Sequence, residues 1–403
     1  MIYMEKKLNN YPLKGIKIAR VSTVPFFVVT QLKTQLHYLK DAGAYVVIIT
    51  SPGIEISQIE LNDKLKYKSI TISRRINLLK DLIALIRLYG YLSKEKFNII
   101  HSTTPKAGLL TAIAGFLANI PVRVHTFTGQ QWETLANPMR YVSRISDKII
   151  GLLNTHCYAD SESQKQFLVS ERIISPKKIG VIGNGSLGGV DLKRFSKRNY
   201  SQPKINIIRN ELKLEANSFV ILYVGRITKD KGINELLYSF RKLISVGKNV
   251  ELLLIGPTDK DFGMRETISL ETISGDSKIH YIGYCTNPEK YMAIANVFCL
   301  PSYREGFGTT VIEAAGMELP TVGTKIKGLI DAVENNVTGI LVEPQSGDAL
   351  FNAFIALLDN PVKLKEMGIA ARHRCKNLYD SNTINSSLVK EYSRLLNILE
   401  KKC

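Results

Sequence analysis

Residues 219–257 read FVILYVGRITKDKGINELLYSFRKLISVGKNVELLLIGP. The apolar runs at 219–224 and 250–255 are short and contain β-branched residues, which predicts two buried β-strands, each closed by a glycine. Between them, residues 233–243 have the apolar spacing of an amphipathic helix. Two strands separated by a helix indicate a βαβ unit, in which the strands are parallel.

The same alternation of strands and helices extends along the chain. In the first half, strands are predicted at 16–21, 45–50, 97–101 and 122–127, and helices at 31–42, 76–92 and 107–117. In the second half, further strands are predicted at 279–282, 297–300, 321–323 and 338–342, and further helices at 288–295 and 310–317. The fold class predicted from this pattern is α/β, with two doubly wound, Rossmann-like domains.

The polar stretch at 183–206 is the predicted junction between the domains. Residues 1–200 are expected to form the first domain and residues 201–381 the second. The last helix, within 382–403, has no strand after it and can cross back to the first domain. Two such domains facing each other place a cleft between the carboxyl ends of their sheets, where open α/β sheets bind ligands. The pattern therefore indicates a cleft enzyme or a two-lobed binding protein.

The composition of the 403-residue chain excludes several classes of protein. With 45% hydrophobic and 22% charged residues, it is too apolar for a disordered chain. Its apolar stretches are shorter than the roughly 18 residues of a spanning helix, and its N-terminus does not have the pattern of a signal peptide. The five cysteines form no CxxC pair, so we expect neither a disulfide framework nor a zinc site, and a cytoplasmic location.

The net charge of +18 is concentrated in one half of the chain. Residues 1–200 hold 29 Lys and Arg against 13 Asp and Glu, whereas residues 201–403 hold 25 against 23. This asymmetry predicts a polyanionic partner for the first half: nucleic acid, an anionic membrane or a phosphorylated substrate. The alternative is a general bias towards lysine that serves solubility.

Residues 301–313, PSYREGFGTTVIE, predict a strand end, a glycine turn and the start of a helix. Gly306 and Gly308 allow the backbone to approach a ligand closely, and the N–H groups that begin the helix suit a phosphate or a polar sugar. Glu305 and Glu313 are placed to accept hydrogen bonds from ligand hydroxyls. The alternative interpretation is a helix with a charged cap.

Residues 223–232, YVGRITKDKG, place two cations in the loop after a predicted strand. Gly225 ends the strand, and Arg226 and Lys231 follow it. A guanidinium and an ammonium at this spacing suit a diphosphate, since arginine makes bidentate contacts and lysine supplies a point charge. An ordinary loop with solvated charges is the alternative.

Taken together, the two segments resemble the donor site of retaining glycosyltransferases of the GT-B fold, family 4, of the bacterial capsular, lipopolysaccharide and exopolysaccharide type. The resemblance implies that Arg226 and Lys231 hold the nucleotide diphosphate. It also implies that Glu305 contacts the transferred sugar and that Glu313 binds the nucleotide ribose. The remaining donor contacts that it implies come from Gly225, Gly306, Phe307, Gly308 and Thr309.

The first half resembles the acceptor domain of the same family, through residues 101–108 (HSTTPKAG) and 123–130 (RVHTFTGQ). Many members carry a histidine just before the glycine of the second segment, where this chain has Thr128, with His125 three residues earlier. His125 and Thr128 are therefore both candidates for lining the cleft near the sugar. For His125 the alternative is a buried histidine at a strand end.

Two further residues of the first half are candidate acceptor contacts. His101 ends a predicted strand and can touch the cleft, with packing as the alternative. Lys106 begins the next predicted helix and can hold a phosphate of the acceptor, with a solvated lysine as the alternative.

No metal or other cofactor is expected. Sugar transferases of the other major fold use an Asp-x-Asp pair to hold a divalent ion on the diphosphate, but residues 259–261 (DKD) look like a surface loop of the second half. Arg226 and Lys231 can neutralise the diphosphate instead. The chain also lacks a GxGxxG fingerprint after its first strand, which disfavours an NAD enzyme.

Residues 74–96, RRINLLKDLIALIRLYGYLSKEK, combine apolar residues with a basic flank. A basic amphipathic helix can lie on an anionic membrane. We expect the apolar stripe itself to pack on the sheet, as a doubly wound fold requires, while the basic flanks can face lipid.

The predicted function is that of a retaining glycosyltransferase that moves a sugar from a nucleotide-diphosphate donor, UDP rather than GDP, to a lipid-linked saccharide in surface polysaccharide biosynthesis. The expected partners are this donor, a polyprenyl-diphosphate-linked or other lipid-linked acceptor, and an anionic membrane surface, with no nucleic acid. The expected location is peripheral, on the inner face of the cell membrane. The alternatives are a nucleotide-sugar epimerase of the same two-domain fold and a non-catalytic protein that binds anionic surfaces.

Overall fold

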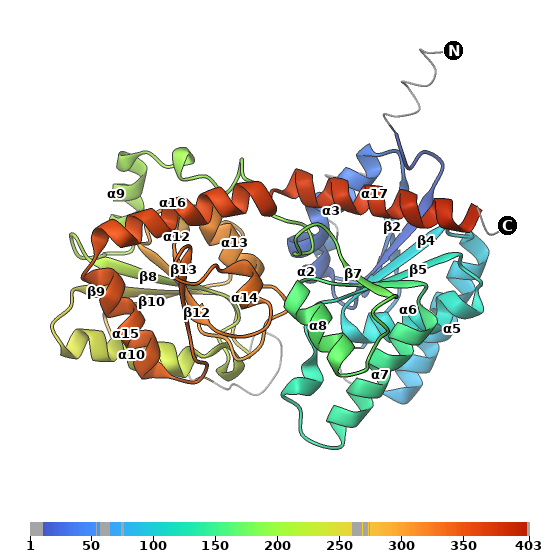
Figure 1. Cartoon of the computed structure of the whole chain (residues 1–403), viewed down its shortest axis with the longest axis horizontal. Coiled ribbons are helices and arrows are strands. Elements are labelled where there is room, and N and C mark those ends of the chain that lie inside the picture. Colours follow the sequence, from blue (N-terminus) through green and yellow to red (C-terminus); the bar gives the residue numbers. More distant parts are fainter. Residues whose placement is uncertain are drawn as a thin grey trace, which may run out of the picture. The chain divides into compact units, whose positions relative to one another are not determined.

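The structure, a computed structural model, describes residues 11–53, 55–56, 65–73, 76–259, 268, 273 and 275–400. The chain forms two compact units, Met1–Gly189 together with Ser381–Cys403, and Val190–Asp380. Each unit holds one parallel β-sheet with helices on both faces (Figure 1). These are the two doubly wound domains that the alternating pattern predicts.

The first unit is built on a seven-stranded sheet in the order β3-β2-β1-β4-β5-β6-β7. Its strands are β1 (Lys17–Val21), β2 (Tyr45–Thr50), β3 (Lys66–Ser69), β4 (Ile99–Thr103), β5 (Val122–Phe127), β6 (His156–Ala159) and β7 (Ile179–Val181). Ile18 of β1 lies opposite Val46 of β2 and Ile99 of β4, both in parallel register. The strand order thus runs outward from β1 to β3 and restarts on the other side of β1 at β4.

Helices cover both faces of this first sheet. One face carries α5 (Leu78–Glu95), α6 (Pro105–Leu117) and α7 (Met139–Leu153), and the other carries α3 (Lys33–Asp41) and α17 (Ser381–Glu400). Ala19 packs with the first group and its neighbour Ile18 with the second, since successive side chains of a strand point to opposite faces. The remaining helices are α2 (Pro25–Phe27), which leads through a π-helical turn at Val28–Leu32 into α3, and α8 (Glu162–Ser170).

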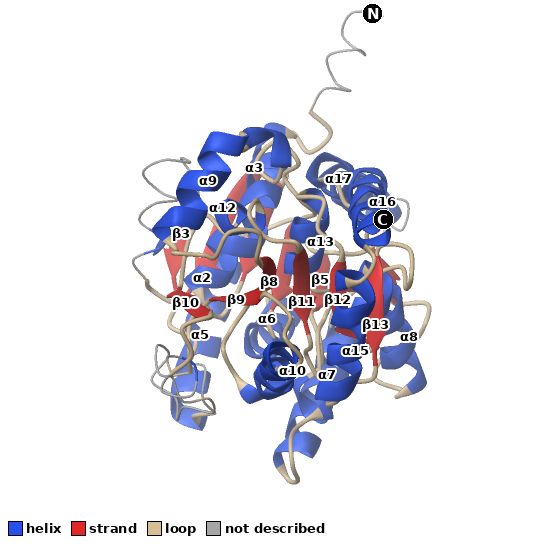
Figure 2. Ribbon diagram, turned by 90° about the vertical axis from the view of Figure 1, so that its left-hand side faces the viewer, coloured by secondary structure: helices blue, strands red, loops and turns tan. Residues whose placement is uncertain are grey.

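The second unit is built on a six-stranded parallel sheet in the order β10-β9-β8-β11-β12-β13. Its strands are β8 (Phe219–Val224), β9 (Val250–Ile255), β10 (Ile279–Gly283), β11 (Val297–Leu300), β12 (Thr321–Thr324) and β13 (Gly339–Val342). Its helices are α9 (Gln202–Glu211), α10 (Ile233–Ser245), α12 (Glu289–Met292), α13 (Thr309–Gly316), α14 (Leu329–Ala332), α15 (Gly347–Leu358) and α16 (Pro361–Leu378). Figure 2 shows α12 and α13 on one side of these strands and α10 and α15 on the other.

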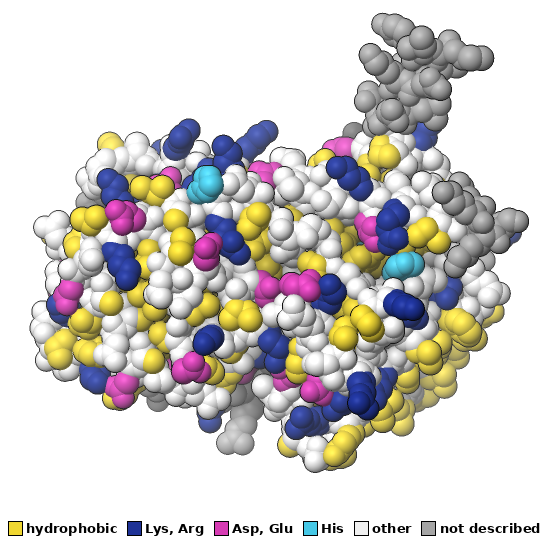
Figure 3. All heavy atoms as spheres, in the orientation of Figure 1, with side chains coloured by type: hydrophobic (Ala, Val, Ile, Leu, Met, Phe, Trp, Pro, Cys, Tyr) yellow, Lys and Arg dark blue, Asp and Glu magenta, His cyan; other side chains and the backbone are white. Residues whose placement is uncertain are grey.

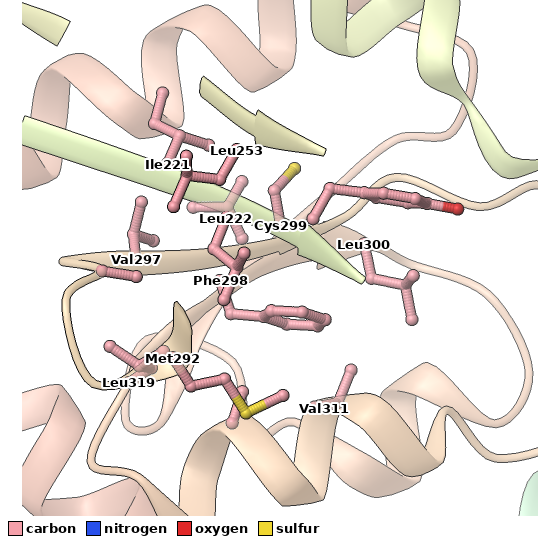
Figure 4. Close-up of a cluster of buried hydrophobic side chains, with 14 of the residues drawn as sticks. Ile221, Leu222, Leu253, Met292, Val297, Phe298, Cys299, Leu300, Val311 and Leu319 are labelled. Carbon is pink, nitrogen blue, oxygen red and sulfur yellow. The ribbon is translucent and has the colours of Figure 1, made fainter. Parts of the chain in front are cut away.

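The core of the second unit is apolar on both sides of the sheet. Phe298 of β11 points towards Met292 of α12 and Val311 of α13, while the next residue, Cys299, points to the opposite face (Figure 4). Phe298 and Cys299 are both fully buried. Strands buried on both faces give the near-continuous apolar runs that made β8 and β9 recognisable in the sequence.

The boundary between the units differs from the predicted one. The first unit ends at Gly189 and not at residue 200, because Val190 donates its N–H to the carbonyl of Tyr379 at 2.8 Å and Phe195 packs in the core of the second unit. At its other end the second unit stops at Asp380, and α17 belongs to the first unit.

The expectation for residues 74–96 is wrong in one respect. Helix α5 buries Ala84, Leu88 and Leu92 against the sheet, but Leu79 and Ile86 of its opposite side are exposed, so its apolar residues do not form a single core stripe. Residues 74 and 75 lie outside the described part of the chain. No helix of the described residues is both long and apolar enough to cross a membrane.

Helix α17 completes the core of the first unit, which gives a test of this connection. Leu388 of α17 is fully buried among residues of α3, β1 and β4, so Leu388→Ala should lower the free energy of unfolding of this unit by about 2–5 kcal/mol. Urea denaturation followed by the fluorescence of Trp132, the only tryptophan of the chain and a buried residue of this unit, measures the change. Asn397→Ala, an exposed site in α17, is the control, and equal stability of both variants would contradict the packing.

Candidate active site

Two loops of the second unit meet at the carboxyl edge of its sheet. One follows β8 and the other follows β11, the neighbouring strands between which the strand order reverses. Lys231 lies on the first loop and Glu305 on the second, and the Nζ atom of Lys231 is 2.5 Å from Oε1 of Glu305. Both side chains are 15% exposed. The reversal point of an open α/β sheet is where ligands bind, and here it presents an ion pair.

Backbone contacts hold these two loops together. Gly232, which follows Lys231, has φ +71°, and a Cβ atom at this position would lie 2.1 Å from the carbonyl oxygen of Pro301. Only glycine therefore allows the loops to approach so closely. Tyr303 also donates its N–H to the carbonyl of Asp230 at 2.9 Å. The distance between Lys231 and Glu305 is thus fixed by the backbone as well as by their charges.

The carboxylate of Glu305 is oriented by Ser302, a residue of the same segment for which the sequence predicts no role. Ser302 donates its hydroxyl to Oε1 of Glu305 at 2.7 Å, and the hydroxyl of Thr324, at the end of β12, donates to the carbonyl of Ser302. Both contacts of the carboxylate are made by Oε1. Among the described residues, no donor contacts Oε2 of Glu305, so this oxygen is able to accept a hydrogen bond from a ligand.

Arg226 lies on the same loop as Lys231 and is 40% exposed. Its Nη2 atom is 3.6 Å from Oδ2 of Asp230. Burial raises the pKa of Asp230, but the hydrogen bond from Thr228 and the charges of Arg226, Lys231 and Arg304 outweigh it and hold that pKa below its ordinary value. Arg304 is thus a further cation next to the two that the sequence identified.

The glycine turn begins α13 as predicted. Gly308 has φ +84° and is the N-cap of α13, so Thr309 is the first residue of the helix. The side chain of Phe307 is buried and contacts the ring of Tyr379 edge to face, with ring centroids 5.1 Å apart. Phe307 therefore anchors the turn through its side chain, and any ligand contact that it makes comes from its backbone.

Glu313 lies in α13, one turn and more beyond the glycine turn, and is partly buried. Burial raises the pKa of its carboxyl to about 7, with repulsion from Glu289 in the same direction and attraction from Arg194 opposing it. Arg194 is held near this carboxyl by Glu289, whose Oε2 lies 2.8 Å from Nη2 of Arg194.

The sheet of the first unit reverses its strand order between β1 and β4, and two threonines meet there. Thr23 follows β1 and donates its N–H to Oγ1 of Thr104, which follows β4, at 3.1 Å. Thr104 has φ 70° and ψ 138°, a conformation that residues other than glycine rarely adopt and that tends to occur at functional sites. The pairing of Thr23 with Thr104 could not be predicted from the sequence, because only the strand order brings the two residues together.

The two candidate histidines of the first unit, His101 and His125, are buried within it. His125 is 2% exposed. Its ring shares a hydrogen bond with the hydroxyl of Ser102 at 2.9 Å and packs against Gly108 of α6. Burial lowers its pKa to about 3, helped by the charge of Arg20. We therefore correct the cleft-lining interpretation: His125 packs between the sheet and α6, and we assign it no proton transfer.

We also correct the prediction that His101 contacts the acceptor, because this residue is buried. Its Nδ1 atom lies 2.5 Å from the hydroxyl of Tyr392 in α17 and its Nε2 atom 2.7 Å from the hydroxyl of Thr126. Burial, with the charges of Arg20 and His125, lowers its pKa well below the ordinary value. Both ring nitrogens are thus used within the unit.

The two other candidates of the first unit lie nearer its surface. The Nζ atom of Lys106, at the start of α6, is 2.9 Å from both carboxylate oxygens of Asp81 in α5, so this lysine is not simply solvated. Thr128 is partly exposed at the carboxyl end of β5, next to Gly129 with φ +95°. Asp259, the first residue of the predicted DKD surface loop, is buried, and residues 260 and 261 lie outside the described part.

Comparison with known proteins agrees with this architecture. The family model described as "Glycosyltransferase Family 4" matches residues 28–187, and the one described as "Glycosyl transferases group 1" matches residues 204–374. Each match falls within one structural unit.

Three relatives have informative names. The capsular polysaccharide biosynthesis glycosyltransferase CapM of Staphylococcus aureus is 32% identical over 391 residues, covering 97% of this chain and all of the relative. The Escherichia coli UDP-Gal:α-D-GlcNAc-diphosphoundecaprenol α-1,3-galactosyltransferase is 29% identical, covering 72% and 74%. The Campylobacter jejuni N,N'-diacetylbacillosaminyl-diphospho-undecaprenol α-1,3-N-acetylgalactosaminyltransferase is 24% identical, covering 77% and 82%.

Solved structures show the same fold. A glycosyltransferase from Rickettsia africae has a TM-score of 0.76 at 23% identity, covering 94% of this chain and 98% of that one. Anabaena HepE in complex with UDP and glucose has a TM-score of 0.78 at 19% identity, covering 94% and 100%.

The two doubly wound units and the matches to their sequences define a glycosyltransferase of the GT-B fold. This assignment sets aside the epimerase and the non-catalytic protein that the sequence left open. The chain belongs to family 4 of these enzymes, with a Glycosyltransferase Family 4 domain followed by a group 1 domain, and it is of the bacterial polysaccharide type.

The raised pKa of Glu313 predicts a pH-dependent stability. A carboxyl whose pKa is about 7 in the folded chain and 4.5 when unperturbed binds its proton more tightly in the folded state. The free energy of unfolding should therefore rise, relative to that of Glu313→Gln, as the pH falls through 7 to 4.5. Urea unfolding of both proteins at a series of pH values measures this, and two parallel curves would contradict the raised pKa.

Proposed function

We propose that the chain transfers a sugar from a UDP-sugar to a lipid-linked saccharide of surface polysaccharide biosynthesis, with retention of the anomeric configuration. The single observation that carries the donor half of this proposal is the ion pair of Lys231 and Glu305 at the strand-order reversal. A cation and a carboxylate side by side at this point suit a nucleotide sugar, which presents a diphosphate next to sugar hydroxyls.

In the proposed donor complex each charged group has one task. Lys231 and Arg226 bind the diphosphate, the guanidinium in bidentate fashion and the ammonium as a point charge. The backbone of residues 306–309 and the N-terminus of α13 lie against the phosphate and the sugar. Oε2 of Glu305 accepts a hydrogen bond from a sugar hydroxyl, and Glu313 binds the ribose.

The transfer step relies on charge stabilisation. As the bond between the anomeric carbon and the oxygen of the leaving phosphate breaks, negative charge builds on UDP, and Lys231 and Arg226 stabilise it. The acceptor hydroxyl attacks from the same face of the sugar and gives its proton to the leaving phosphate oxygen. This route retains the configuration without a side-chain nucleophile. We propose no metal requirement, since the cations of the loop after β8 neutralise the diphosphate.

The lipid-linked acceptor and the UDP donor are extended from relatives. The Escherichia coli and Campylobacter jejuni relatives are named for acceptors on diphosphoundecaprenol, and the former is named for UDP-Gal. A lipid-linked acceptor places the enzyme on the inner face of the cell membrane. In the first unit, Lys106 is the remaining candidate acceptor contact, and it would have to exchange Asp81 for a phosphate of the acceptor. Thr128 is a candidate contact near the sugar.

Substitutions of the ion pair test the donor site. Lys231→Ala and Glu305→Ala should each lower kcat/KM for sugar transfer from a UDP-sugar by about a hundredfold or more, because each removes a charge aimed at the reacting groups. Lys242→Ala and Asp348→Ala break a comparable but exposed ion pair of the same unit, 2.6 Å long, and should leave the rate unchanged. Full activity of both Lys231→Ala and Glu305→Ala, in proteins that remain folded by circular dichroism, would show that the donor binds elsewhere.

A further inference from the structure

Helix α5 exposes an apolar stripe on the side that faces away from the sheet. Six of its large apolar side chains are exposed, with Leu78 at 83% and Leu79 at 69%. They lie opposite the buried Ala84, Leu88 and Leu92, since residues three or four positions apart share one side of a helix. The exposed set is Leu78, Leu79, Leu82, Ile83, Ile86 and Tyr89.

Helix α7 repeats this arrangement. It buries Ile150 and Gly151 and exposes five large apolar side chains, of which Leu152 is 74% exposed. The exposed set is Met139, Tyr141, Val142, Ile145 and Leu152. Helix α6 packs between α5 and α7 on the same face of the sheet, and its last residues, Phe116 and Leu117, are also exposed. We call the outward side of these helices the α5–α7 surface.

Exposed apolar side chains are concentrated on this surface. Helices α5 and α7 together carry eleven of the 25 exposed large apolar side chains in the described residues, whereas the whole of Val190–Asp380 carries eight. Figure 3 shows such side chains in yellow along the edge of the first unit where α5 lies. Scattered exposed apolar residues are ordinary, but a contiguous group marks a surface that binds a partner or a membrane.

The charges around this apolar surface have one sign. Every exposed charged side chain of α5, α6 and α7 is basic, and these are Lys80, Arg87, Lys94, Arg140 and Lys148. None of the acidic residues of the three helices is exposed. Asp81 is paired with Lys106, Glu95 is paired with Lys17, and Asp147 is buried against Trp132. The surface is therefore apolar with a purely cationic border.

We propose that the α5–α7 surface inserts into the headgroup region of an anionic lipid bilayer. Basic amphipathic helices lie in this way, with the apolar side among the acyl chains and the cations at the headgroups. A second copy of the chain would bring like charges together in a symmetric contact, and nucleic acid would leave the leucines in water. This membrane surface would bring the enzyme to a lipid-linked acceptor, and in that respect the inference rests on the proposed function. The binding of vesicles itself does not depend on it.

Vesicle sedimentation tests the proposal on the full chain. The wild type should bind vesicles of phosphatidylglycerol and phosphatidylcholine in equal parts more tightly than vesicles of phosphatidylcholine alone, and added salt should weaken that binding. Leu82→Ser/Ile86→Ser should lower the partition coefficient about tenfold or more. Each removed cation in Arg87→Gln/Lys148→Gln should lower it about fivefold.

Matched controls come from α16 of the second unit. Val362→Ser/Ile369→Ser and Lys365→Gln/Lys376→Gln make the same kinds of change at exposed positions and should bind vesicles like the wild type. Binding of UDP, followed by calorimetry, should be equal in all variants. Urea unfolding followed by the fluorescence of Trp132, a buried residue of the first unit, shows that the α5–α7 variants are folded.

Three results would overturn the proposal. The first is a wild type that does not bind the anionic vesicles, and the second is equal binding by the α5–α7 variants and the wild type. The third is a wild type that self-associates through this surface in size-exclusion chromatography and ignores vesicles. If vesicles bind as expected but UDP does not, the donor site is wrong and the membrane surface stands. If UDP binds and vesicles do not, the proposed membrane surface is wrong and the donor site stands.

Discussion

In a doubly wound sheet the strand order reverses once, and the loops that follow the two strands at that point leave a crevice between them. In the second unit those loops follow β8 and β11, and the ion pair of Lys231 and Glu305 joins residues 74 positions apart in the chain. Gly232 allows the approach, and Ser302 fixes the carboxylate. Each proposed contact with the nucleotide sugar depends on this junction, because it sets where the diphosphate and the sugar can lie.

The sequence predicts best the strands that are buried on both faces. Strands β2, β5, β8, β9 and β11 occupy the predicted residues, since a parallel sheet covered by helices demands continuous apolar runs. Strands β3 (KYKS), β6 (HCYA) and β7 (IGV) are absent from the prediction. They have three or four residues each, too few for a periodic pattern, and β3 is a polar edge strand that is held by its pairing with β2.

The site could be predicted only as far as local motifs reach. The glycines and charges of the loops after β8 and β11 are neighbours in sequence, so their chemistry is readable. The contacts of Thr324 and Thr104 could not be predicted, because they depend on which strands lie side by side, whereas Ser302 lies only three residues before Glu305 and its contact is local. A histidine at a strand end also looks the same whether its ring faces a ligand or a helix, and the structure turns His101 and His125 inward. The exposure of the outer side of α5 was not predicted for a similar reason, because its apolar residues are equally suited to a core and to a lipid surface.

Five exposed basic residues of the positively charged first half lie on the α5–α7 surface, and Arg226, Lys231 and Arg304 of the nearly neutral second half lie in the loops of the proposed donor site. A crystal structure of the chain with a bound UDP-sugar tests the proposed donor site most directly. We expect the diphosphate within hydrogen-bonding distance of Nζ of Lys231 and the guanidinium of Arg226, with a sugar hydroxyl on Oε2 of Glu305. A diphosphate bound away from these residues, with the Lys231–Glu305 pair untouched by the ligand, would contradict the proposed site.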